Sequence, residues 1–202
     1  MTVQEKQFVK FVKAECKKYG VKCKLVKAPS VKTNDAGISE CSGYFDGENK
    51  QLVCAIEVNP DWIGILAHEY CHLTQWVEDA PIWKKSEKHN TYGFVNEWLS
   101  GEPVRNIKFH LGICRDLELD NEKRTVNIIK KFGLDVDLSE YIQKSNAYVH
   151  YYNYMYYNRT WCTPTNSPHR VTDVWKNMPK TFNMKYTSMS NKVKKLYDTV
   201  YL

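Results

Sequence analysis

The stretch GILAHEYCHLTQW, residues 64–76, places two histidines and one glutamate in an otherwise uncharged, mostly apolar run. Four apolar residues in or beside it recur at helical spacing: Leu66, Tyr70, Leu73 and Val77. Residues 64–77 are therefore predicted to form a helix with one apolar stripe. His68 and His72 are four residues apart, so both imidazoles project from one face of that helix, one turn apart.

This spacing lets both histidines bind a single tetrahedral metal ion, and the ligand types favour zinc. Glu69, next to the first histidine, lies close enough to a metal-bound water to act as its base. The alternative is a core helix whose histidines hydrogen-bond internally and whose glutamate pairs with a lysine. Burying two imidazoles and a carboxylate without a cation is costly, so we favour the metal site. Cys71 within the motif is expected to be a buried, inert thiol.

The motif resembles that of the gluzincin metallopeptidases, in which a glutamate on a later helix is the third zinc ligand and opens a Glu-x-x-x-Asp pattern. Residues 118–133, ELDNEKRTVNIIKKFG, fit that place. The resemblance implies that Glu118 is the third ligand. It also implies that Glu122, where the pattern has aspartate, supports a zinc-binding histidine. Asp116, Asp120 and Glu122 itself are rival third ligands.

The layout is also similar to small zincins of bacteria and phages. The resemblance covers about residues 40–135, with a helical C-terminal part at about 136–202, and we expect residues 1–202 to form a single metallopeptidase-like domain. Zinc held by His68, His72 and Glu118 would activate water, with Glu69 as general base. Six residues are candidates for stabilising the oxyanion, and the sequence does not choose among them: Tyr148, His150, Tyr151, Tyr152, Arg159 and His169.

The rest of the chain predicts an α+β fold, with a small antiparallel or mixed sheet packed against several helices. The resemblance implies that this fold is zincin-like around the active-site helix. The expected helices are 3–19, 87–99, 104–132 (with a kink or break at Gly112), one capped by Asp137 and Glu140, and 190–202. The expected strands are 21–29 and two within 44–58 that are joined by a turn at 46–49, whereas residues 28–43 are expected to form a loop.

Composition limits the classes of function. Of its 202 residues, 43% are hydrophobic, which argues against disorder. Its formal charge of +6 comes from lysines scattered along the chain, which argues against nucleic-acid binding. A charged N-terminus and no run of ~20 apolar residues predict neither a signal peptide nor a membrane span. Seven cysteines without a Cys-x-x-Cys pair suit free thiols. We expect a cytoplasmic protein of a bacterium or a phage-infected cell.

The favoured function is therefore zinc-dependent hydrolysis of peptide bonds in a protein or peptide substrate, with one zinc ion per chain. One alternative is a non-proteolytic binding or regulatory protein that keeps a zincin scaffold and engages an acidic partner. Another is a zinc hydrolase that acts on a non-peptide amide. The intact Glu69 favours catalysis, because a protein that only binds has no need of the base.

Overall fold

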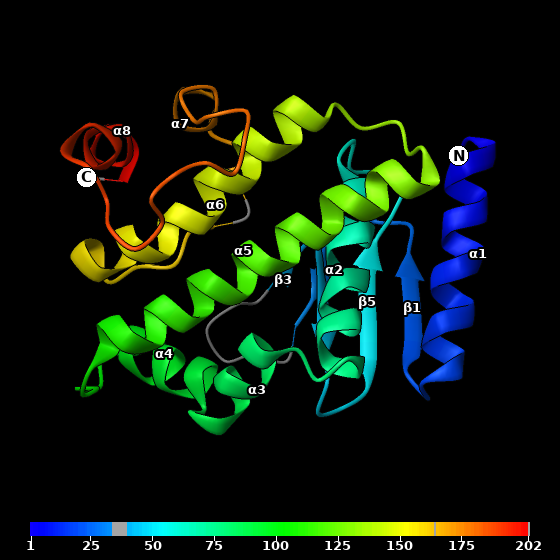
Figure 1. The fold of residues 1–202 in the computed structure, drawn as a ribbon, viewed down its shortest axis with the longest axis horizontal. Coiled ribbons are helices and arrows are strands. Elements are labelled where there is room, and N and C mark those ends of the chain that lie inside the picture. The colour runs from blue at the N-terminus through cyan, green and yellow to red at the C-terminus, as the bar shows by residue number, and fades with distance from the viewer. Residues whose placement is uncertain (34–39, 164, 202) are drawn as a thin grey trace. The chain divides into compact units, whose positions relative to one another are not determined.

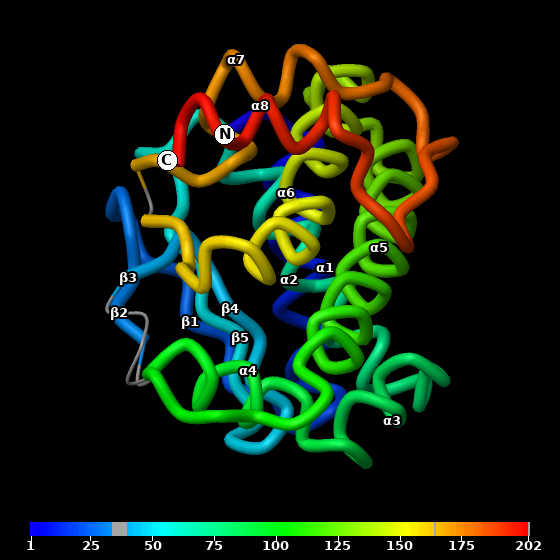
Figure 2. The backbone as a smooth tube through the Cα atoms, turned by 90° about the vertical axis from the view of Figure 1, so that its left-hand side faces the viewer, coloured from blue at the N-terminus to red at the C-terminus, as the bar shows by residue number. Residues whose placement is uncertain are grey.

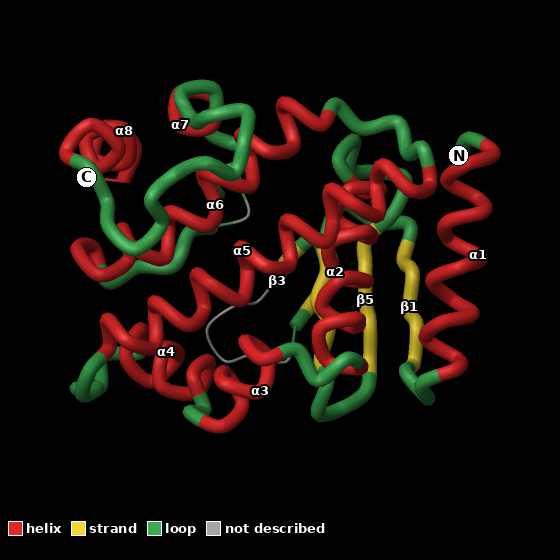
Figure 3. Tube along the Cα trace, viewed as in Figure 1, coloured by secondary structure: helices red, strands yellow, loops and turns green. Residues whose placement is uncertain are grey.

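The computed structural model describes residues 1–33, 40–163 and 165–201. Within this part of the chain it contains eight helices, a mixed three-stranded sheet and a two-stranded sheet, which confirms the predicted α+β class (Figure 1, Figure 3). The chain divides into two compact units. Unit 1 comprises Met1–Ala80 and Asn121–Val136, and unit 2 comprises Pro81–Asp120 and Asp137–Leu202.

Unit 1 holds the strands together with α1, α2 and the C-terminal part of α5. The bounds of these elements are α1 Val3–Lys18, β1 Lys22–Val26, β2 Val31–Lys32, β3 Glu40–Cys41, β4 Gly43–Asp46, β5 Gln51–Ala55, α2 Trp62–Val77 and α5 Ile107–Phe132. Unit 2 holds the N-terminal part of α5 and the remaining helices: α3 Pro81–Lys88, α4 Thr91–Leu99, α6 Leu138–Asn158, α7 Thr172–Trp175 and α8 Asn191–Tyr201.

The three-stranded sheet of unit 1 has the order β1-β5-β4, with β1 parallel and β4 antiparallel to β5. The predicted strands are confirmed, and so is the turn between β4 and β5. Asp46 accepts hydrogen bonds from the backbone N–H and the side-chain amide of Asn49, at 2.9 and 2.8 Å. Residues 52–55 of the central strand β5 are all buried, as expected for a strand covered on both faces.

Helices α1 and α2 cover one face of this sheet (Figure 2). Phe8 and Phe11 of α1 pack against Tyr70 of α2, with ring centroids 6.1 and 5.3 Å from that of Tyr70. The same two phenylalanines contact Phe132 at the end of α5. This aromatic cluster joins the two helices and the end of α5 into one core beneath the sheet.

Two local predictions are wrong. Residues 28–43, expected as a loop, contain β2 and β3, which pair antiparallel as Val31 with Cys41 and Lys32 with Glu40; residues 34–39 lie outside the described part. Two-residue strands are too short to show an alternating pattern. The helix expected at 87–99 is two helices, α3 and α4, separated at Asn90, whose φ of 44° interrupts the helical path.

Unit 2 is organised around α6, which packs against α7 and α8. Asp137 caps α6 as predicted, accepting hydrogen bonds from the N–H groups of Ser139 and Glu140 at 2.8 and 3.1 Å. Tyr154 of α6 stacks on Tyr197 of α8 at a centroid distance of 5.1 Å, and Tyr151 meets the same ring at a tilt of 46° and 6.1 Å. Gly112 causes no break, because α5 is one continuous helix.

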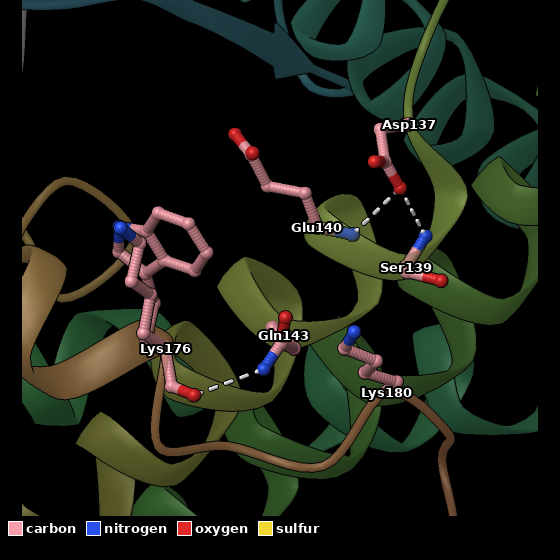
Figure 4. A pocket seen from close by; sticks show the side chains of 7 residues that line it. Asp137, Ser139, Glu140, Gln143, Lys176 and Lys180 are labelled. Atoms are coloured by element: carbon pink, nitrogen blue, oxygen red, sulfur yellow. Dashed lines mark hydrogen bonds between the residues drawn. The ribbon is translucent and has the colours of Figure 1, made fainter.

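A pocket at the N-terminal end of α6 contains none of the predicted site residues (Figure 4). It is lined by Asp137, Ser139, Glu140, Gln143, Trp175, Lys176 and Lys180. Its polar groups serve the fold: the Asp137 carboxylate caps the helix, and the Gln143 amide donates to the carbonyl oxygens of Lys176 and Met178 at 3.1 and 2.7 Å. Of the described helices, none is long and apolar enough to cross a membrane.

Candidate metal centre

Helix α2 carries the candidate site and is buried on nearly every side. Eleven of its 16 residues are buried, among them Glu69, His72 and Gln75. The helix predicted at 64–77 is confirmed, beginning two residues earlier at Trp62, and Cys71 is fully buried as expected. Polar side chains on an interior helix are costly unless they have partners.

His68 and His72 direct their Nε2 atoms toward each other. These two atoms are 3.1 Å apart, and the ring planes are nearly perpendicular at 84°. His72 is buried, whereas the His68 side chain keeps 16% exposure, so solvent reaches the pair at His68. Among the described residues, His68, Glu69 and His72 form the one group that could hold a metal ion, with ligand atoms all within 4.8 Å of one another.

The Nδ1 atoms of the two histidines both face oxygen acceptors. Gln75 Oε1 lies 2.9 Å from His72 Nδ1, and Glu122 Oε1 lies 3.2 Å from His68 Nδ1. An imidazole donates to such an oxygen through a protonated Nδ1, which in the neutral ring leaves Nε2 with a lone pair. With both rings in that tautomer, the two Nε2 lone pairs face each other at 3.1 Å and repel unless a cation binds them; with one Nε2 protonated, the same contact is a hydrogen bond. The arrangement is the one that outer hydrogen bonds impose on metal-binding histidines.

Glu69 is positioned by a close approach of the sheet. A Cβ at Gly43 of β4 would lie 3.0 Å from Glu69 Cγ, 3.2 Å from the Val53 carbonyl oxygen and 3.3 Å from Ile65 Cγ2. Any larger residue at position 43 would therefore press on the Glu69 side chain. Burial, and after it the charge of Glu69, raises the pKa of the Cys54 thiol on β5, so Cys54 stays protonated beside the carboxylate.

The C-terminal part of α5 holds α2 through two contacts of unit 1. Asn121 Nδ2 donates to the His68 carbonyl oxygen at 3.2 Å, and Arg124 forms an ion pair with Glu78 at 2.5 Å. Sequence reasoning identified Glu122 on this helix but missed Asn121 and Gln75. The contact of Gln75 with His72 could have been predicted from the sequence, because residues three apart on a helix lie next to each other on its surface.

Glu118 lies in unit 2 and is buried. Tyr92 of α4 donates its hydroxyl to Glu118 Oε1 at 3.2 Å. Desolvation, and after it the charge of Glu118, raises the pKa of the buried Cys114 and that of Tyr92, although 40% of Tyr92 is exposed. The histidines belong to unit 1, so a shared metal ion stays a prediction. No local pattern identifies Tyr92, which precedes its partner by 26 residues.

The rival acidic ligands have different surroundings. The Asp116 side chain is 45% exposed and forms an ion pair with Arg115 at 2.7 Å. Glu122 contacts the Nδ1 of His68 rather than its Nε2. A carboxylate at Nδ1 orients a metal-binding histidine and does not itself bind the metal. Asp120 is half-buried on the same helix. The third metal ligand therefore stays a prediction.

Three of the six oxyanion candidates make contacts that stabilise unit 2. The Tyr151 hydroxyl donates to the Thr160 carbonyl oxygen at 3.1 Å. Arg159 donates to the carbonyl oxygens of Trp98 and Glu102 at 2.7 and 2.8 Å. His150 is buried and stacks on Tyr186 at a centroid distance of 5.3 Å.

The other three candidates lie together in unit 2. The hydroxyls of Tyr148 and Tyr152 are 3.3 Å apart, and His169 meets the Tyr148 ring edge-on at 6.0 Å. Burial raises the pKa of Tyr152, with smaller contributions from Tyr148 and Glu118, so its hydroxyl remains a donor near the Glu118 carboxylate. The structure thus leaves two tyrosines and His169 as candidates.

Replacing Gln75 tests its role in orienting His72. Gln75→Met fills a similar volume without the acceptor oxygen, and we expect zinc affinity about 10- to 100-fold weaker. Gln75→Glu keeps an acceptor and is expected to bind zinc within a few-fold of the wild type. Titration against a competing chelator measures both. Equal affinities in the wild type and Gln75→Met would show that the 2.9 Å contact does not orient the ring.

His150 makes stability depend on pH. Burial, with a smaller contribution from the Arg115 charge, lowers the pKa of His150 to about 4. In the unfolded chain the histidine pKa is about 6.5, so as the pH falls the unfolded state takes up the proton before the folded state does. The free energy of unfolding therefore falls as the pH is lowered from about 6.5 to 4. We expect this histidine to contribute on the order of 3 kcal/mol to that fall.

Urea unfolding across this pH range measures the effect. His150→Phe keeps a ring against Tyr186 but does not titrate, so its stability should vary less with pH than that of the wild type. His89→Phe, at a half-buried histidine of unit 2, is the matched control and should keep the wild-type dependence. A pH dependence of His150→Phe that equals the wild type would contradict the assignment.

Comparison with known proteins gives no match. No protein-family model, no curated protein and no solved structure matches the chain. The functional interpretation therefore depends on the residues of the site and their geometry, above all on the His68, Glu69 and His72 group.

Proposed function

We propose that this chain is a zinc-dependent metallopeptidase of zincin type, in which His68 and His72 bind the metal and Glu69 is the general base. The observation that carries the proposal is the pair of Nε2 atoms 3.1 Å apart, with both Nδ1 atoms facing oxygen acceptors. Two nitrogens bound to one tetrahedral zinc, each at 2.0–2.1 Å, are about 3.4 Å apart. The observed spacing is close to that value, so the residues fit the ion.

The third protein ligand in this proposal is Glu118, as the gluzincin resemblance implies. A catalytic zinc usually has three protein ligands and one open position. Glu118 supports the assignment through its burial and its hydrogen bond from Tyr92, which is typical of a ligating carboxylate held by an outer donor. Glu122 takes the supporting role at His68 Nδ1.

Zinc bound at this site would polarise a carbonyl oxygen and make a water molecule acidic enough to lose a proton near neutral pH. A carboxylate oxygen of Glu69 accepts that proton as the water attacks, and then donates it to the leaving amine. The ligand atoms of Glu69, His68 and His72 lie within 4.8 Å of one another, which puts the carboxylate within reach of that water. Buried surroundings strengthen these interactions, because little water screens the charges.

The experiment that tests this function measures metal and hydrolysis together. The 202-residue chain is purified without added metal, its metal content is measured by mass spectrometry, and cleavage of a labelled unfolded protein is followed. We expect about one zinc per chain. We also expect hydrolysis that stops on chelation and returns with zinc. Protein that is folded but metal-free, or hydrolysis that chelation does not change, would contradict the proposal.

A further inference from the structure

Exposed aromatic side chains gather in unit 2. Among the described residues, the large apolar side chains that are exposed in this unit are all aromatic: Tyr92, Phe94, Phe109, Tyr156 and Tyr157. The exposed aliphatic ones, Met1, Val3 and Val58, all belong to unit 1. Single exposed apolar side chains are ordinary, whereas a group of them marks an interaction site. Unit 2 therefore presents flat rings to solvent.

These rings lie around the N-terminal end of α5, where α3, α4 and the C-terminal end of α6 approach it (Figure 1). His89, directly after α3, and His110 of α5 meet the Phe109 ring at 88° and 80°, with centroids 5.0 and 5.4 Å away. Phe94 of α4 packs on His110 at 4.8 Å. These contacts hold the Phe109 ring in place, although 43% of that residue is exposed.

A lysine ammonium lies beside each of two exposed rings. Lys108 Nζ of α5 is 4.2 Å from the ring centroid of Tyr156 on α6, and Lys85 Nζ of α3 is 5.6 Å from that of Phe109. Both lysines are exposed, and neither forms an ion pair with another residue that the structure describes. The first turn of α5 holds no acidic residue, so the positive end of the helix dipole adds to the charge of Lys108.

The charge of unit 2 favours an anionic partner. Unit 2 contains 15 lysines and arginines and 10 acidic residues, and therefore carries +5 of the formal charge of +6, whereas unit 1 contains 14 and 13. A second copy of the chain would bring the same positive charge and be repelled. An acidic protein would match the charge but not the repeated pairing of a flat ring with a cation.

We propose that Phe109 and Tyr156, with Lys85 and Lys108, form a ring–lysine surface that binds single-stranded nucleic acid. Each nucleotide repeats one flat base and one phosphate. The phosphate draws the lysine ammonium away from the ring face, because a charge-assisted hydrogen bond is stronger than an exposed cation–π contact. A base then stacks on the ring. Every base has such a face, so binding shows little sequence preference.

The fold reverses the expectation from the sequence, in which scattered lysines argued against nucleic-acid binding. Lys85 and Lys108 are 23 positions apart in the chain, yet both lie beside exposed rings of unit 2. The ring–lysine surface needs neither the metal nor the general base, because His68, Glu69 and His72 belong to unit 1. Chelated protein and Glu69→Gln should therefore bind nucleic acid like the wild type.

The test titrates the 202-residue chain into fluorescein-labelled oligothymidylate of about 16 nucleotides and follows fluorescence anisotropy. We expect a dissociation constant of about 1–100 μM near 50 mM salt. Two phosphate contacts predict about sevenfold weaker binding near 200 mM salt. A duplex of the same length should bind more weakly, because its bases are stacked on each other. Attraction by charge alone would favour the duplex, whose charge density is higher.

Variants separate stacking from charge. Phe109→Leu and Tyr156→Leu keep an apolar side chain without the ring, and each should weaken binding about fivefold or more. Tyr156→Phe keeps the ring and should bind like the wild type. Lys85→Gln and Lys108→Gln should each reduce the slope of log affinity against log salt by about 0.7. Circular dichroism verifies that each variant is folded.

Two controls are matched to these variants. Tyr19 of unit 1 also has a lysine beside its ring, with Lys18 Nζ 4.7 Å from the centroid, but the ring is half-buried and Lys18 pairs with Glu15 at 3.8 Å. Tyr19→Leu should therefore leave the affinity unchanged. Lys185→Gln removes an exposed lysine of unit 2 that has no ring contact in the described part, and should leave the salt slope unchanged.

Three results would overturn the proposal. The first is tighter binding of the duplex than of the single strand. The second is wild-type affinity in folded Phe109→Leu and Tyr156→Leu. The third is displacement of the labelled strand by oligoglutamate or by anionic lipid vesicles as efficiently as by unlabelled oligothymidylate, which would assign the surface to an acidic protein or to a membrane.

Discussion

Replacing His72 with alanine is expected to remove the metal from the purified protein. The change deletes one of the two Nε2 atoms that face each other at 3.1 Å, together with the ring that Gln75 orients. Loss of an outer hydrogen bond weakens zinc binding about 10- to 100-fold, so loss of a ligand itself should weaken it by at least about 100-fold. Metal content by mass spectrometry and chelator competition measure the change.

His110→Ala is the matched control, because His110 is also a buried histidine but lies in unit 2, against Phe94 and Phe109. Circular dichroism shows whether each variant is folded. His72→Ala should be folded and metal-free, and His110→Ala should hold about one zinc per chain. Wild-type zinc content in folded His72→Ala would show that the metal binds elsewhere, and the histidine pair would then be an ordinary part of the core.

Local features of the fold could be predicted because a few neighbouring residues determine them. The apolar spacing of Leu66, Tyr70 and Leu73 identified α2. Asp46 identified the turn before β5, and Asp137 the start of α6, since each carboxylate bonds to backbone N–H groups within three residues. Such contacts leave the same signal in any tertiary setting.

Features that depend on distant contacts could not be predicted. β2 and β3 are each two residues long and are strands because they pair with each other. Asn90 ends one helical stretch and begins another through a left-handed φ that many residues disfavour but asparagine tolerates. Each unit consists of two segments that alternate along the sequence, and one boundary lies inside the continuous helix α5, where no linker composition marks it.

The same division applies to the candidate site. His68, Glu69 and His72 were found from their spacing, because four residues along a helix always bring two side chains to one face. Glu122 was assigned by resemblance, and the structure places its carboxylate 3.2 Å from His68 Nδ1. The contact of Tyr92 with Glu118 depends on how α4 packs in unit 2, which no local pattern encodes.

Glu69→Gln is expected to abolish hydrolysis while zinc stays bound. The amide has nearly the same shape as the carboxylate but cannot accept a proton, and general base catalysis typically contributes a factor of about 10²–10⁴. We therefore expect kcat to fall by at least about 100-fold at unchanged zinc content. Glu57→Gln, at an exposed glutamate of unit 1, is the control and should keep full activity.

A second variant, in strand β4 of the sheet, is expected to displace the Glu69 carboxylate. Gly43→Ala adds a methyl group that would lie 3.0 Å from Glu69 Cγ and 3.2 Å from the Val53 carbonyl oxygen, so it would press on the Glu69 side chain. Displacing the base by a fraction of an ångström should lower kcat by about tenfold or more without releasing zinc, because position matters as much as chemistry in proton transfer. Loss of activity in both variants with zinc retained would establish Glu69 as the base. Full activity in Glu69→Gln would refute that role, and a zinc-loaded wild type that cleaves nothing would favour the binding protein with an acidic partner.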